Sequence, residues 1–250
     1  MNKNSNIYQI LYAAVMVLIV GTVLAFIYMA LKPKQDDNVA NDKRKQILSA
    51  VHMTPASDDV IEETFNKYII AGYLLNKDGS VADSAQNVAF EIDMKNNIKL
   101  EERDLPLFKC KLDDGSIKYI VPVYGAGLWG PIWGYVAVND NGTDIYGAYF
   151  SHEGETPGLG AEIANPNFQE QFKGKNIYPD GEFKSVSVMK AGQKPTDGSE
   201  YVNAISGGTI TSRGVQAMLS ECMMPYDAFF KKLQSETNLI CGTDLECETK

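Results

Sequence analysis

The chain has 250 residues, of which 44% are hydrophobic, and a formal net charge of -9 at pH 7. A chain of this length can bury a substantial core, and it fits one domain with an appendage or two small domains. The acidic balance argues against nucleic acid as a partner. Nucleic acid is held by clustered Lys and Arg, and the sequence has no such cluster.

An apolar segment stands near the N-terminus. Residues 10–31 are almost wholly apolar, and no residue from Asn4 to Leu31 is charged. As a helix this segment would span a hydrocarbon core of about 30 Å, so it predicts one transmembrane helix after a short N-terminus, residues 1–9. The alternative is a cleaved signal peptide. Such peptides have shorter apolar regions and an Ala-x-Ala-like site, which residues 28–32 do not resemble.

Basic residues lie on both sides of the predicted helix. Lys3 and the amino terminus precede it, whereas the side that follows has the larger number, Lys32, Lys34, Lys43, Arg44 and Lys45. By the positive-inside rule, this distribution leans weakly towards a cytoplasmic large domain. Long domains translocate largely regardless of charge, so the charges alone leave the orientation open.

The remaining chain divides into three predicted parts. Residues 32–42 are polar and predict a short tether, residues 43–235 a globular domain, and residues 236–250 a C-terminal tail. Cys241 and Cys247 lie close enough in this tail to form a disulfide if the compartment is oxidising. The spacing itself leaves that pairing open.

Helices are predicted at the start of the domain and strands after residue 117. Apolar residues at helical spacing predict two modest helices, at 43–53 and 58–71. The polar stretch 75–105 predicts surface loops with one amphipathic piece. Short β-branched and aromatic runs separated by Gly, Pro, Asn and Asp then predict strands at 119–124, 132–138, 145–150 and 183–188.

The C-terminal part of the domain predicts two further helices. A short helix is expected at 167–172 after Pro166, and a long helix from near Ser212, with an apolar face and a kink at Pro225. The short connections between the predicted strands favour hairpins. The expected class is therefore α+β, with one mainly antiparallel twisted sheet and helices packed on it.

Two familiar kinds of site are not supported. Residues 125–130 read Gly-x-Gly-x-x-Gly, but Pro131 and another strand follow where a dinucleotide-binding fold needs a helix. The two histidines, His52 and His152, have no Cys-x-x-Cys or His-x-x-x-His neighbour. Neither zinc nor c-type haem is therefore expected.

The strongest candidate site reads Ser-Gly-Gly-Thr-Ile-Thr-Ser at residues 206–212, directly before the predicted long helix. Paired glycines let the backbone turn, and a helix start offers unpaired N–H groups to a phosphate. A capped helix after a Gly turn would look the same, and Thr211 or Ser212 is expected to be the helix cap. With the Gly-rich loop 152–162 and Trp129, however, this stretch predicts a site for a planar, phosphorylated ligand.

These motifs resemble a known family. Residues 206–209 are similar to the Ser-Gly-Ala-Thr flavinylation motif of FMN-binding domains, in which the final Thr is joined to FMN by a phosphoester bond. Residues 127–130, residues 155–160 and the single N-terminal span resemble the NqrC family of the Na⁺-translocating NADH:quinone oxidoreductases. The chain departs from the motif in having Asn203 in place of Asp and Gly208 in place of Ala.

The resemblance implies an electron-relay subunit of a complex that couples NADH oxidation by quinone to Na⁺ export. It implies FMN bound covalently to Thr209 and delivered by a flavin transferase that uses FAD. It also implies a bacterial inner-membrane protein whose soluble domain faces the periplasm, in contact with other subunits. The residues that it places at the flavin, besides Thr209, are Ile205, Ser206, Gly207, Gly208, Thr211, Trp129, Glu155, Thr156, Leu159, Gly160 and Lys190.

Two alternatives stay open at this point. The first is the equivalent FMN-bearing subunit of an Rnf-type complex, which shares the FMN-binding domain. The second is a membrane-anchored module that binds phosphate or lipid and has no redox role.

Overall fold

The computed structural model describes residues 6–85 and 87–244, with side chains described up to residue 236. It divides into two compact units, Met1–Lys43 and Arg44–Lys250. The predicted pairing of Cys241 with Cys247 lies outside the residues whose side chains are described.

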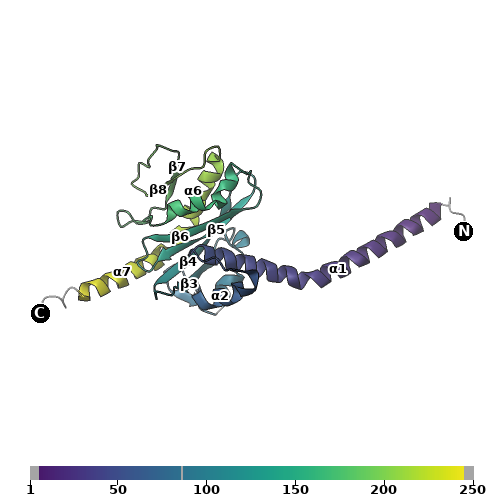
Figure 1. The fold of residues 1–250 in the computed structure, drawn as a ribbon, viewed down its shortest axis with the longest axis horizontal. Coiled ribbons are helices and arrows are strands. Elements are labelled where there is room, and N and C mark those ends of the chain that lie inside the picture. The colour runs from purple at the N-terminus through teal and green to yellow at the C-terminus, as the bar shows by residue number, and fades with distance from the viewer. Residues whose placement is uncertain (1–5, 86, 245–250) are drawn as a thin grey trace. The chain divides into compact units, whose positions relative to one another are not determined.

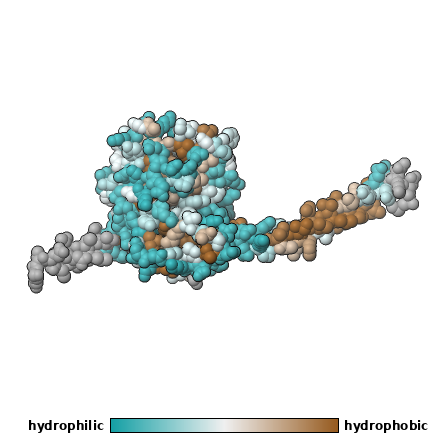
Figure 2. Space-filling model, viewed as in Figure 1, coloured by the Kyte–Doolittle hydropathy of each residue, from teal (hydrophilic) through white to brown (hydrophobic). Residues whose placement is uncertain are grey.

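The first unit consists of most of helix α1, which runs from Asn6 to Ser49. Its apolar part is long enough to cross a membrane, and the side chains there are exposed. Figure 2 shows this part of α1 as a continuous hydrophobic surface. Residues 32–42, the predicted tether, are helical and belong to α1. Lys32 pairs with Asp36 one turn later at 2.6 Å, a spacing that supports a helix.

The last turn of α1 belongs to the second unit. Gln46, Ile47 and Leu48 are buried there, and the Trp133 indole N–H donates to Gln46 Oε1 at 3.0 Å. The helix ends at Ser49, earlier than the predicted end at residue 53.

The second unit is built on one antiparallel sheet of six strands in the order β2-β1-β3-β4-β5-β6, which confirms the predicted α+β class (Figure 1). The strands are β1 (Ile69–Leu75), β2 (Val81–Asp83), β3 (Leu105–Lys111), β4 (Ile117–Ala126), β5 (Pro131–Asn139) and β6 (Ile145–His152). A separate parallel pair is formed by β7 (Ser187–Met189) and β8 (Tyr201–Asn203).

The first half of this unit corrects two predictions. The helix expected at 58–71 is a short 3₁₀ turn, η1 (Asp58–Val60), and α2 (Ile61–Tyr68), after which the chain enters β1. The stretch 75–105, expected as surface loops with one amphipathic piece, contains β2, α3 (Val88–Glu91) and α4 (Met94–Asn97) and leads into β3. The apolar residues of β1 fit both periods, and pairing with β3 decides in favour of a strand.

Apolar residues cover both faces of the sheet. One core joins the sheet to the C-terminal helices through residues such as Val121, Val136, Val215, Met218 and Phe230. The other core joins it to the end of α1 and to α2 and α3 through Ile47, Phe65, Ala89, Phe108 and Ala137. Neighbours in β5 therefore point to opposite sides, as the pleat of a strand requires.

The C-terminal helices are α6 (Thr209–Met223) and α7 (Asp227–Asp244), separated by η4 (Met224–Tyr226), which contains Pro225. Pro225 therefore breaks the predicted long helix in two. The predicted short helix appears as α5 (Pro166–Gln169) and η3 (Glu170–Phe172), preceded by η2 (Gly160–Ala164).

Close packing brings α6 to the end of β4. A Cβ at Gly214 would overlap the carbonyl oxygen of Ala126, and the Cys222 thiol donates to the Tyr124 carbonyl at 3.3 Å. The Gly-x-Gly-x-x-Gly stretch forms the turn between β4 and β5, where the Gly127 N–H donates to the Gly130 carbonyl at 2.8 Å. The pattern is thus a hairpin and not a dinucleotide-binding turn.

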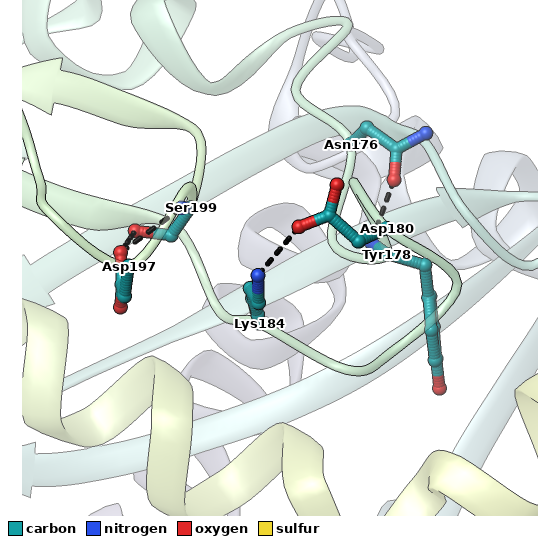
Figure 3. Close-up of polar contacts among 6 residues, drawn as sticks. All are labelled: Asn176, Tyr178, Asp180, Lys184, Asp197 and Ser199. Carbon is teal, nitrogen blue, oxygen red and sulfur yellow. Dashed lines mark hydrogen bonds and ion pairs between the residues drawn. The ribbon is translucent and has the colours of Figure 1, made fainter.

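Polar contacts shape the long connection from residue 176 to residue 200 (Figure 3). Lys184 pairs with Asp180 at 2.6 Å, and the Ser199 hydroxyl donates to Asp197 at 2.7 Å. The Val188 N–H donates to the Gln216 side chain at 2.9 Å. The last contact joins β7 to α6, and the other two are local contacts within the connection. The strand predicted at 183–188 is shorter than expected and lies outside the main sheet.

Candidate functional site

Thr209 is the first residue of α6 and follows a tight turn. Gly207 has φ +76°, a backbone conformation that favours glycine, and a Cβ at this position would lie 2.5 Å from the end of the Leu159 side chain. Gly208 is the N-cap residue, and no side chain caps the helix. The Thr209 side chain is half-buried and forms no hydrogen bond with a described residue.

The structure contradicts the prediction that Thr211 or Ser212 caps the helix, because both lie inside α6. Each is 1% exposed and has another partner. The Ser212 hydroxyl accepts from the Ile205 N–H at 3.1 Å, and the Thr211 hydroxyl donates to Glu155 Oε2 at 2.6 Å. These two side chains fix the turn before Thr209 and the loop facing it.

Glu155 is a buried carboxylate with three partners. It is 4% exposed, and its Oε1 accepts from the Trp129 N–H at 2.8 Å. Burial favours a higher pKa, but the hydrogen bonds from Thr211 and from the backbone of Trp129 and Leu128 outweigh it. They hold the pKa of the Glu155 carboxyl below its ordinary value. We call this carboxylate, with Thr211 and the Trp129 N–H, the Glu155 cluster.

Glycines make room for the Glu155 cluster. A Cβ at Gly160 would overlap both Glu155 Oε2 and Thr211 Oγ1, and a Cβ at Gly127 would overlap Glu155 Oε1. The two Gly-rich stretches of the sequence therefore meet at one carboxylate.

Two cavities meet at Thr209, which lines both. The apolar cavity has a volume of about 210 Å³ and exposed apolar residues at its rim, among them Trp129, which is 70% exposed. It is lined by Leu128, Trp129, Glu155, Thr156, Leu159, Gly160, Gly207, Gly208, Thr209, Ile210 and Thr211. The polar cavity, of about 730 Å³, is lined by Val188, Met189, Lys190, Gln193, Ala204, Thr209, Ser212, Arg213, Gln216, Ala217, Ser220 and Glu221.

The apolar cavity brings together most of the predicted site residues: Trp129, Glu155, Thr156, Leu159, Gly160, Gly207, Gly208, Thr209 and Thr211. Lys190 lines the polar cavity instead. Ser206 is exposed in the turn and lines neither cavity. Ile205 lies under the turn, where a Cβ at Gly208 would be 3.0 Å from Ile205 Cγ2.

Three residues that line the cavities were not predicted from the sequence and are suited to contact a ligand. Leu128 and Ile210 flank predicted residues and add to the apolar rim. Arg213 lines the polar cavity and is four residues after Thr209. Helical spacing places Arg213 next to Thr209, but the predicted helix started near Ser212 and so did not include Thr209.

The arrangement fits a flat, phosphorylated ligand such as FMN. An uncapped helix start leaves backbone N–H groups without intrahelical acceptors, and these groups favour a phosphate. The apolar rim suits a flat ring system, and glycines let the backbone approach it closely.

Comparison with known proteins agrees with this chemistry. The family model of the FMN-binding domain matches residues 127–223, which include every predicted site residue. The NqrC subunit of the Na(+)-translocating NADH-quinone reductase from Haemophilus ducreyi is 32% identical, over 86% of this chain and 88% of that protein. The chain belongs to the NqrC family.

A solved structure of an NqrC family member, from Parabacteroides distasonis, is 44% identical. The match covers 80% of this chain and 96% of that chain, with a TM-score of 0.74. The NqrC protein from Neisseria meningitidis serogroup B is 32% identical over 80% of this chain and 82% of that protein. These relatives favour NqrC over the FMN-bearing subunit of an Rnf-type complex, and the FMN-binding domain disfavours a module without redox chemistry.

Proposed function

We propose that this chain carries FMN on Thr209 through a phosphoester bond. The FMN-binding domain and membership of the NqrC family make it an FMN-carrying electron-relay subunit of the Na⁺-translocating NADH-quinone reductase, in contact with other subunits of that complex. Bound FMN supplies reversible electron transfer, and the protein contributes binding, orientation and electrostatics. A covalent bond suits a relay because the cofactor cannot dissociate.

The observation that carries the proposal is the difference among the four hydroxyl groups of the motif. Thr211 and Ser212 are buried and hydrogen-bonded, and Ser206 lines neither cavity. Thr209 combines a hydroxyl without a described partner with a place at the start of an uncapped helix. The helix dipole would stabilise the charge of a phosphodiester there by about 0.3–1 kcal/mol.

We expect the surrounding residues to hold FMN in different ways. Leu159 and Ile205, with the exposed Trp129, are the apolar groups that we expect to exclude water from the ring. The Glu155 cluster keeps the loop that carries Leu159 in place. We further propose that a flavin transferase attaches FMN from FAD, since the exposed Ser206-Gly207 turn leaves Thr209 accessible.

The apolar helix and the family together indicate a single-pass membrane-anchored protein. We propose that the anchor lies in a bacterial inner membrane and that the second unit faces the periplasm, as the family resemblance implies. Alkaline phosphatase fused after residue 250 should then be active. An inactive phosphatase fusion together with a fluorescent C-terminal green fluorescent protein fusion would place the unit in the cytoplasm.

Coexpression with a flavin transferase tests the attachment. We expect wild-type chain to show flavin fluorescence on a denaturing gel and Thr209→Val to lose it completely while keeping its circular dichroism spectrum. Thr211→Val is the matched control and should keep the fluorescence. Peptide mass mapping that finds the FMN on Ser206 or Thr211 would overturn the assignment.

A further inference from the structure

Two basic side chains, Arg213 and Lys190, line the polar cavity. Neither the Arg213 guanidinium nor the Lys190 ammonium forms a hydrogen bond or an ion pair with any residue that the structure describes. The charged lining is completed by the single carboxylate of Glu221. In a chain with a net charge of -9, a cavity lined with an excess of positive charge points to an anion.

Arg213 stands on the same face of α6 as Thr209. The two are four residues apart, which in an α-helix is a rise of about 6 Å, and side chains at this spacing are neighbours. Glu221 is eight residues beyond Arg213, a rise of about 12 Å, which is too far for a direct ion pair along the helix. Arg213 is exposed, and its positive charge is therefore available to a group close to Thr209.

We propose that Arg213 is a positioning residue that pairs with the phosphodiester joining FMN to Thr209, an inference that rests on the covalent attachment proposed above. A guanidinium presents donors in a planar fork that matches two phosphate oxygens at once. Thr209 lies where the apolar and polar cavities meet, so the charged end of the cofactor has its counterion on one side and the apolar rim on the other.

Lys190 is the weaker of the two counterions. It follows β7 in an exposed loop, and its ammonium is a compact, strongly hydrated charge on a flexible stem. Arg213 instead projects from α6, the same rigid element that carries the phosphoester. Removing Arg213 should therefore disturb the phosphate more than removing Lys190.

The phosphodiester can be observed directly by ³¹P NMR of the full-length flavinylated chain in detergent. Arg213→Gln removes the charge and keeps a polar side chain of similar width. Arg213→Lys retains the charge. Lys194→Gln is a control that removes a positive charge from the exposed loop that carries Lys190, because Lys194 itself lines neither cavity. Circular dichroism and flavin fluorescence on a denaturing gel establish folding and attachment in each variant.

We expect the phosphodiester resonance to shift in Arg213→Gln, to return part of the way in Arg213→Lys and to stay in place in Lys194→Gln. In wild type, 1 M NaCl should move the resonance towards its position in Arg213→Gln, since salt screens an exposed ion pair. Arg213→Gln should no longer respond in this way.

Three results would overturn the role of Arg213. They are an unchanged resonance in flavinylated Arg213→Gln, an equal shift in Lys194→Gln, and a folded Arg213→Gln that receives no FMN, which would assign Arg213 to recognition by the transferase. Wild-type chain without covalent flavin would instead refute the attachment to Thr209 itself.

Discussion

The first turn of α6 faces two different environments. On one side, the Glu155 cluster buries a carboxylate and a threonine hydroxyl and provides a partner for each. On the other side, the polar cavity leaves Thr209, Lys190 and Arg213 without described partners. Two threonines separated by one residue thus have opposite roles. The comparison teaches that the buried side fixes the turn, whereas the open side is available to a ligand.

The strongest way to break this contrast is to crowd the Glu155 cluster. Gly160→Ala places a methyl group where Glu155 Oε2 and Thr211 Oγ1 already lie. Overpacking and the loss of the hydrogen bond between them should lower the free energy of unfolding by about 3 kcal/mol. Urea unfolding followed by circular dichroism measures this loss.

Gly154→Ala is the matched control for that experiment. A Cβ at Gly154 meets no atom within 4 Å, so the substitution should change stability by less than about 1 kcal/mol. Equal losses for Gly154→Ala and Gly160→Ala would show that packing around Glu155 is not what makes the loop sensitive.

A smaller change removes one hydrogen bond and keeps the shape. Thr211→Val deletes the hydroxyl that donates to Glu155, and a bond to a buried charged group contributes about 1.5–3 kcal/mol. Thr209→Val deletes a hydroxyl without a described partner and should cost less than about 0.5 kcal/mol. Thermal unfolding of the two variants without flavin compares the two sides of the turn directly. Equal melting temperatures would contradict the contrast.

The smallest effect concerns pH. Because the pKa of Glu155 is lower in the folded chain, its ionised form contributes stability above the ordinary value of 4.5, and this share is lost as the pH falls through the folded-state pKa. As the pH falls from 4.5 through the folded-state pKa of Glu155, the free energy of unfolding of Glu155→Gln should therefore decrease less than that of wild type. Other carboxyls with lowered pKa, such as Asp197, are present in both proteins and cancel in the difference. If the free energy of unfolding fell equally with pH in both proteins, Glu155 would not contribute to the acid sensitivity.

The sequence correctly predicts those elements whose residue pattern fits only one type of secondary structure. β4, β5 and β6 carry β-branched and aromatic residues between clear turn signals, and each was predicted to within about two residues. β1 was predicted as the end of a helix and β3 was missed. The residues of β1 fit both periods, and only its pairing with β3 in three dimensions distinguishes them.

The same limit applies to the site. The glycine and hydroxyl motif located the turn before α6, but hydroxyl residues close to a helix start were interpreted as caps. Thr211 and Ser212 point instead to Glu155 and to the Ile205 N–H, partners that are contributed by tertiary packing or by the turn itself. The two cavities around Thr209 depend on where β7 and the Glu155 loop lie, which no local pattern specifies.

The missing cap of α6 has a consequence for how the chain matures. Gly208 leaves the first N–H groups of the helix without a side-chain acceptor, so before modification this turn lacks the stabilisation that a cap provides. A phosphodiester on Thr209 would supply the acceptor oxygens that the sequence omits, and the cofactor would complete the secondary structure that holds it. Attachment of FMN would then slow the opening of this turn, and a chain that missed its flavin would differ from the finished protein in local dynamics as well as in colour.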